Sequence, residues 1–192
     1  MTLSARYTDA LTFAAEAHHG QLRKGTSIPY LSHLLAVSGL VLEHGGDETE
    51  AIAGLLHDAI EDVGAHLREP IRERFGVEVL VIVEGCTDAD VQPKPPWRAR
   101  KEAYIAHLRH APPPVLRVSA ADKLHNARCI LADYHAHGPA LWRRFNASAA
   151  ETAWYYTAVA DILAAAGAPP TLVGELGRTV EALRTAGAFP RA

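Results

Sequence analysis

Apolar side chains recur at helical spacing along most of the chain, and no stretch alternates apolar and polar residues as a half-buried strand does. Glycines and prolines interrupt the pattern, among them Gly45-Gly46, Pro112 to Pro114 and Pro169-Pro170. The intervening segments are mostly about 10–20 residues long, which is typical of globular helices. The sequence therefore predicts an all-α fold: one compact multi-helix domain over residues 1–192, with an irregular stretch from Thr87 to Trp97 and a C-terminal packing helix over about 171–187.

Composition and charge argue against some classes of binding partner. The formal net charge is −3 and the pI about 6.4, which argues against general nucleic-acid binding but leaves room for a small anionic ligand. No apolar run approaches the roughly 18 residues that a membrane span needs, and the first residues form no apolar signal core. Cys86 and Cys129 lie far apart and in no metal or redox spacing. We therefore expect a protein of the reducing cytoplasm with no membrane partner.

The segment from Asp47 to Gly64 predicts one amphipathic helix. Asp47 and Glu50 have the spacing of a capping box, and Gly64 is a typical C-terminal stop. At about 100° per residue, one face of this helix is apolar. The other face gathers an imidazole and three carboxylates within two turns: His57, Asp58, Glu61 and Asp62.

This polar face has two readings. A solvated surface is the simpler one. However, acids at the C-terminal end of a helix oppose the helix dipole, and no lysine or arginine stands four residues away to offset them. A bound metal ion would account for the arrangement.

Further candidate ligands come from other segments. His33 lies at the start of a predicted helix, just after Pro29-Tyr30. Asp122 is flanked by alanines and a leucine, where a carboxylate is expensive to bury unless it is paired or binds a metal, and Asn126 lies one turn further on. Two imidazoles and two carboxylates without a thiolate suit Mn²⁺ or Fe²⁺ better than structural zinc.

Three stretches of the sequence resemble a known family. They are AHHGQLRKGTSIPYLSH at residues 17–33, HDAIED at residues 57–62 and ADKLHNAR at residues 121–128. All three, in this order, resemble the hydrolase domain of RelA/SpoT homologues. The likeness spans about residues 6–165, and the chain carries no recognisable synthetase domain. It is therefore similar to the stand-alone small alarmone hydrolases, which have the all-helical HD-type fold.

The resemblance implies roles for individual residues. It implies one Mn²⁺ per chain, held by His33, His57, Asp58 and Asp122. It implies a catalytic acidic pair, Glu61 and Asp62, and nucleotide contacts from Arg23, Lys24 and Asn126. The implied substrate is a guanosine or adenosine nucleotide, (p)ppGpp or (p)ppApp, whose 3′-diphosphate is hydrolysed to pyrophosphate. Further candidates for substrate binding are Lys123 and the Arg100-Lys101 pair for phosphates, with Tyr156 or Tyr155 stacking on the base.

Some positions depart from the family pattern and leave alternatives open. Leu34 stands where a proline often follows the first metal histidine, and Cys129 stands where many members have a hydroxyl residue. The segment from Thr87 to Tyr104 is also short and proline-rich. Base selectivity and oligomeric state therefore stay open. Two alternatives are an HD phosphohydrolase of another nucleotide and a non-catalytic nucleotide-binding HD protein, although the latter has little reason to keep the acidic pair.

Overall fold

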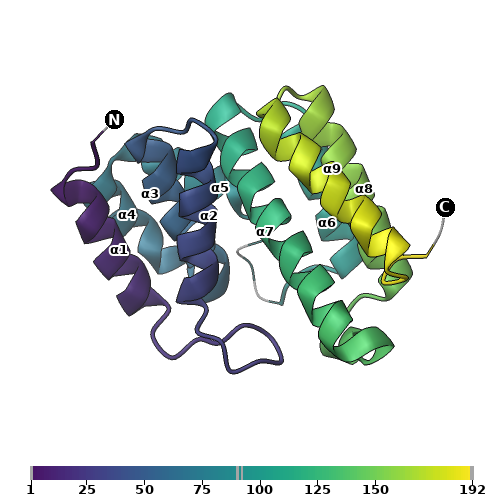
Figure 1. The fold of residues 1–192 in the computed structure, drawn as a ribbon. Helices are drawn as coiled ribbons and strands as arrows, with labels where there is room; N and C mark the ends of the chain where they lie inside the picture. The colour runs from purple at the N-terminus through teal and green to yellow at the C-terminus, as the bar shows by residue number, and fades with distance from the viewer. Residues whose placement is uncertain (1, 90, 92, 191–192) are drawn as a thin grey trace.

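A computed structural model describes residues 2–89, 91 and 93–190 of the chain (Figure 1). Within these residues the chain forms nine α-helices and no β-strand, and its only extended pairing is an isolated bridge between Leu22 and Pro29. The predicted all-α fold is confirmed. The helices are α1 (Ala5–Ala17), α2 (Leu31–Glu43), α3 (Glu48–Leu56), α4 (Arg68–Phe75), α5 (Val77–Cys86), α6 (Trp97–Leu108), α7 (Pro113–His137), α8 (Ala149–Ala165) and α9 (Pro170–Thr185).

Helix α7 occupies the centre of the molecule. It is 25 residues long and runs between a group made of α1 to α5 and a group made of α6, α8 and α9 (Figure 1). It contacts α2, α3 and α5 on one side and α8 and α9 on the other. A polar residue on α7 is therefore either buried or placed between the two groups of helices.

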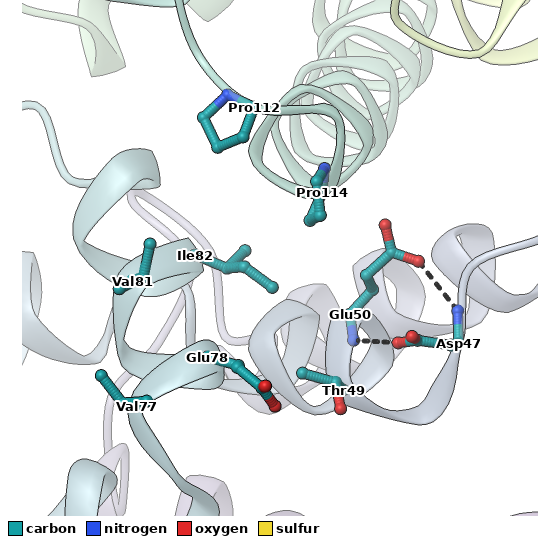
Figure 2. Close-up of a pocket in the computed structure, with 9 residues that line it drawn as sticks. All are labelled: Asp47, Thr49, Glu50, Val77, Glu78, Val81, Ile82, Pro112 and Pro114. Carbon is teal, nitrogen blue, oxygen red and sulfur yellow. Dashed lines mark hydrogen bonds between the residues drawn. The ribbon is translucent and has the colours of Figure 1, made fainter.

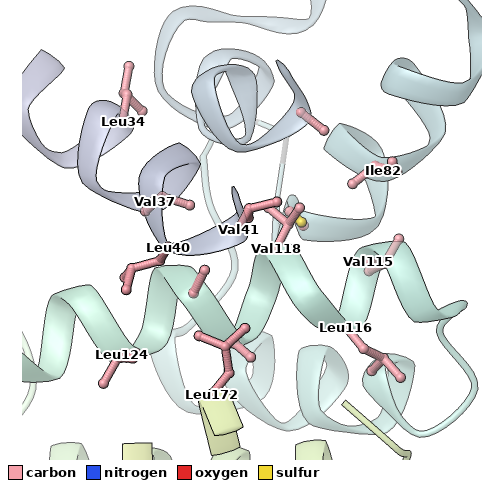
Figure 3. Packing of buried hydrophobic residues seen from close by; sticks show 14 of the residues in the cluster. Leu34, Val37, Leu40, Val41, Ile82, Val115, Leu116, Val118, Leu124 and Leu172 are labelled. Atoms are coloured by element: carbon pink, nitrogen blue, oxygen red, sulfur yellow. The ribbon is translucent and has the colours of Figure 1, made fainter. Parts of the chain in front are cut away.

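The core forms where both groups meet α7. Figure 3 shows Leu34 and Val37 of α2, Val118 and Leu124 of α7, and Leu172 of α9, all fully buried. Burying each such side chain contributes about 1.5–3 kcal/mol. This packing holds α2 and α7 side by side.

Helix α3 begins as predicted but ends early. Asp47 and Glu50 form the expected capping box, visible in Figure 2 beside a hollow bordered by α3, α5 and the first turn of α7. The α-helix stops at Leu56, and residues Ala59–Val63 form a π-helical turn that closes at Gly64. The single helix predicted from Asp47 to Gly64 is thus wrong in its second half. The wider turn advances each residue by a smaller angle, so the single-helix projection fails beyond His57.

Helices α2 and α3 approach each other closely at Gly54. A Cβ atom added there would lie 3.1 Å from the Cα atom of Ser38. Ser38 is buried, and its hydroxyl donates a 2.8 Å hydrogen bond to the Ala51 carbonyl of α3. A larger residue at position 54 would push the two backbones apart.

We expect Gly54→Ala to destabilise the fold by about 1–3 kcal/mol, because it overpacks this contact. Gly39→Ala on α2 is the matched control, since nothing lies within 4 Å of a Cβ atom built there. The control should gain up to about 1 kcal/mol from the better helix propensity of alanine. Urea unfolding measures both, and equal stabilisation by the two substitutions would contradict the close contact.

Candidate metal centre and its pocket

Two imidazoles face each other between α2 and the end of α3. His33 lies in the first turn of α2, and His57 follows the last residue of α3. The Nδ1 atom of His57 lies 2.9 Å from the Gly54 carbonyl of its own helix, which orients the ring. The ring centroids of the two histidines are 5.1 Å apart, and both side chains are 1% exposed.

Two carboxylates complete the cluster. The Asp58 Oδ2 atom lies 3.0 Å from His57 Nε2 and 3.5 Å from His33 Nε2. The Asp122 Oδ1 atom, from α7, lies 3.3 Å from His33 Nε2 and 3.7 Å from His57 Nε2. The candidate ligand atoms of His33, His57 and Asp58 all lie within 4.8 Å of one another. The structure therefore brings together the four residues that the sequence pointed to.

The polar atoms of this cluster fit a divalent cation. The Nε2 atoms of His33 and His57 are buried and find no hydrogen-bond partner within the described part of the chain, a costly state for a polar atom. Burial by itself lowers the pKa of His57, yet the Asp58 and Asp122 carboxylates raise it well above its ordinary value. The site thus favours a positive charge next to Nε2. Nitrogen and oxygen donors without a thiolate suit a metal such as Mn²⁺ or Fe²⁺.

Two residues that the sequence analysis missed support the cluster. The Tyr30 hydroxyl donates a 2.5 Å hydrogen bond to Asp58 Oδ2. Burial and the Asp58 charge raise the pKa of Tyr30, so its hydroxyl stays protonated. His125 lies 2.8 Å from His33 through their Nδ1 atoms, and burial with His33 alongside lowers its pKa to about 4. Tyr30 lies one turn before His33, and His125 one turn after Asp122, so helical spacing was the available signal.

Glu61 and Asp62 lie in the π-helical turn beside the cluster, and each has a partner from a distant segment. Glu61 forms a 2.8 Å ion pair with Lys94, and Asp62 accepts a 2.9 Å hydrogen bond from the Gln21 amide. Burial and the Asp88 carboxylate raise the pKa of Glu61, while burial and Asp58 raise that of Asp62. The partner of Glu61 comes from the loop between α5 and α6, which a search within one helix could not find.

On α7, Asp122 is held by its own neighbours. Lys123 Nζ and Asn126 Nδ2 each donate to its carboxylate at 2.5 Å. Although burial disfavours a charge there, Asp122 keeps the pKa of Lys123 well above its ordinary value. Arg23 donates to the Asn126 oxygen at 3.1 Å, which links the predicted basic pair to the cluster.

A pocket with two lobes adjoins the cluster. The lobes, of about 280 and 230 Å³, share Lys24, Asn126, Ile130, Phe145 and Tyr156. Arg23 and Cys129 line the first lobe. Lys101 and Lys123 line the second, together with Tyr155.

The other predicted substrate residues are already engaged. The Tyr156 side chain is 7% exposed, so its ring is mostly core, although one edge borders both lobes. Arg100 and Lys101 each contact the buried Asp88 carboxylate at 2.5 Å. Both side chains are therefore already paired with an acid, although Lys101 also lines the second lobe.

A protein-family model described as an HD domain matches residues 10–152. The chain belongs to the HD-domain family. The cluster of histidines and aspartates at the junction of α2, α3 and α7 is thus the candidate metal centre of an HD domain.

Similar proteins indicate which kinds of HD-domain protein this chain resembles. This HD domain is 38% identical over 122 residues to a probable GTP pyrophosphokinase of Mycobacterium leprae, covering 62% of this chain and 15% of that protein. It is 33% identical over 123 residues to a guanosine-3′,5′-bis(diphosphate) 3′-pyrophosphohydrolase of Haemophilus influenzae, covering 61% and 17% respectively. The chain therefore spans less than a fifth of the length of these two relatives. The resemblance to RelA/SpoT proteins is confirmed.

Solved structures match over more of the HD domain. A structure described as a metazoan orthologue of SpoT that hydrolyses ppGpp is 27% identical, with a TM-score of 0.79 over 98% of this chain and 99% of that one. A crystal structure of a Listeria monocytogenes EGD-e protein is 28% identical, with a TM-score of 0.67 over 81% and 98%. Among the described residues of this HD domain, no helix is long and apolar enough to cross a membrane.

The raised pKa of Asp62 predicts a pH-dependent stability. A carboxyl whose pKa is raised in the folded state contributes stability below its ordinary pKa and loses it as the pH rises through the raised value. We therefore expect Asp62→Asn to stabilise the metal-free protein at pH 8, with a gain that disappears in acid. Asp161→Asn, at an exposed carboxylate of α8, should change stability by less than about 0.5 kcal/mol at either pH. Thermal unfolding in the presence of a chelator tests this, and a gain from Asp62→Asn that grew toward acid would contradict it.

Proposed function

We propose that this HD domain is a metal-dependent hydrolase of alarmone nucleotides, (p)ppGpp or (p)ppApp, that removes the 3′-diphosphate as pyrophosphate. The observation that carries the proposal is the pair of buried, unpartnered Nε2 atoms of His33 and His57, which face two carboxylates beside a basic pocket. The similarity to a ppGpp hydrolase over nearly the full length of both chains supports the substrate class.

The metal would be held by His33, His57, Asp58 and Asp122, with Mn²⁺ as the preferred ion. When bound, such an ion polarises a phosphoryl oxygen and acidifies a water. The Tyr30 hydrogen bond orients Asp58. Although burial opposes this, the His57 charge and the two histidine side chains hold the pKa of Asp58 well below its ordinary value. Lys123 and Asn126 orient Asp122 by donating to its carboxylate. Although burial opposes this too, the Lys123 charge holds the pKa of Asp122 well below its ordinary value.

Glu61 and Asp62 are the candidates for handling the proton of the attacking water. Their raised pKa values bring these carboxyls closer to neutral pH, where a general base works best. Water attacks the phosphorus bonded to the 3′ oxygen, and the bond between that phosphorus and the 3′ oxygen breaks, which releases pyrophosphate. The 3′ oxygen takes up the proton lost by the water and becomes a hydroxyl. Because both acids are present and poised beside the cluster, a purely binding role is disfavoured.

Arg23 and Lys24 are the best candidates for contacting the nucleotide. Both line the first lobe, and the buried Nη1 atom of Arg23 has no hydrogen-bond partner among the described residues, so it has a donor to offer. Lys24 donates a 2.9 Å hydrogen bond to the neutral Asn146 side chain. Lys123, Arg100 and Lys101 are each paired with a carboxylate and contribute less to phosphate binding.

Removing a metal ligand and removing an acid should have different effects. We expect the wild type to bind about one Mn²⁺ ion per chain. His57→Ala should abolish this binding and also the release of pyrophosphate from ppGpp. Glu61→Gln should retain the metal but lower kcat by about 10²–10⁴-fold. Elemental analysis and a pyrophosphate assay measure the two effects, with Asp161→Asn as control. Full activity of His57→Ala would overturn the proposal.

Removing Arg23 or Lys24 should weaken substrate binding more than catalysis. Loss of a charge-assisted hydrogen bond of about 1.5–3 kcal/mol raises KM roughly tenfold to a hundredfold. The defect should shrink at high salt, where the wild-type attraction is already screened. Arg128→Ala is the matched control, because Arg128 lies on the exposed side of α7 and contacts Glu175. Steady-state kinetics with guanosine and adenosine substrates measure KM. A wild-type KM in both variants would contradict this assignment.

A further inference from the structure

One face of α7 contains a residue that the proposed mechanism does not use. Asp122, His125, Asn126 and Cys129 follow one another at spacings of three, one and three residues, so they share a side of the helix. Asp122 belongs to the metal cluster, and Asn126 borders the pocket. His125 lies between them.

His125 contacts a metal-cluster histidine on the side away from the cluster. The Nδ1 atoms of His125 and His33 are 2.8 Å apart, and the ring centroids are 4.9 Å apart. The opposite nitrogen of His33, Nε2, faces Asp58 at 3.5 Å and Asp122 at 3.3 Å. A hydrogen bond between two ring nitrogens needs one proton, so one of the two Nδ1 atoms must be bare.

Metal binding would determine which of the two Nδ1 atoms carries this proton. To bind a cation, His33 Nε2 must present its lone pair, so the proton of the neutral ring is on Nδ1 and points to His125. His125 Nδ1 is then the acceptor, and its own proton is on Nε2. That atom lies 3.7 Å from Cys129 Sγ, a weak acceptor at the wall of the pocket.

We propose that His125 is a positioning residue that fixes the tautomer and ring orientation of His33 for metal binding. Metal-bound histidines usually donate their other N–H to a carboxylate, a carbonyl or water. Here the acceptor is an imidazole, which holds the ring without adding a further negative charge to a cluster that already contains two aspartates. The inference rests on the proposed metal site.

The test compares an acceptor-free variant with one that keeps an acceptor. His125→Leu should weaken Mn²⁺ binding about tenfold to a hundredfold, measured by calorimetry on the metal-free protein. His125→Asn places an amide oxygen near the position of Nδ1 and should bind the metal more like the wild type than like the leucine variant. His135→Leu, on an exposed part of the same helix, should bind as the wild type does. Unchanged affinity in His125→Leu, or equal weakening in the asparagine variant, would overturn the inference.

A second measurement uses the wild-type protein and does not depend on whether a variant folds. Nitrogen-15 NMR of the Zn²⁺-loaded protein reports which ring nitrogen of each histidine carries the proton. We expect His33 to be protonated on Nδ1 and His125 on Nε2; a proton on His125 Nδ1 would refute the proposal. If the wild type bound neither Mn²⁺ nor Zn²⁺, the proposed metal site itself would be wrong. If the wild type bound metal and His125→Leu bound it equally well, only the role of His125 would be wrong.

Discussion

The fold depends on placing four polar groups where three helices converge. Burying imidazole nitrogens and carboxylates separately would carry a large penalty, and at this junction the two histidines and two aspartates offset it for one another. Tyr30, Lys123 and Asn126 add hydrogen bonds to the two aspartates. Their meeting needs α2 and α3 in close contact, which Gly54 permits, and α7 passing alongside. The apolar packing around α7 supplies the energy that holds these helices together.

The charges around this centre balance locally. Most basic side chains near the pocket contact a carboxylate: Lys94 with Glu61, Lys123 with Asp122, and Arg100 and Lys101 with Asp88. Arg23 and Lys24 differ, because they donate to the neutral side-chain amides of Asn126 and Asn146. An incoming polyanion would therefore meet its strongest uncompensated attraction at the side of the pocket where these two residues lie.

Much of this arrangement could be predicted from the sequence. The fold class follows from periodicity, and the Asp47 cap from capping chemistry. The cost of a buried aspartate draws attention to Asp122, whereas its grouping with His33, His57 and Asp58 is what the family resemblance implies. What could not be predicted depended on distant contacts. The π-helical turn has no signature in helical periodicity, and the Lys94 partner of Glu61 lies 33 residues away along the chain. The charge of Lys123 is visible in the sequence, but its pairing with Asp122 is not.

The unbroken α-helix from Pro113 to His137 also sets a length scale. Asp122, at the metal cluster, and Cys129, at the wall of the first lobe, are separated by seven residues of one rigid rod, a rise of about 10 Å. Loops can stretch or fold to follow a ligand, but a helix packed on both sides cannot. Helix α7 therefore fixes the separation between the metal cluster and this wall of the first lobe.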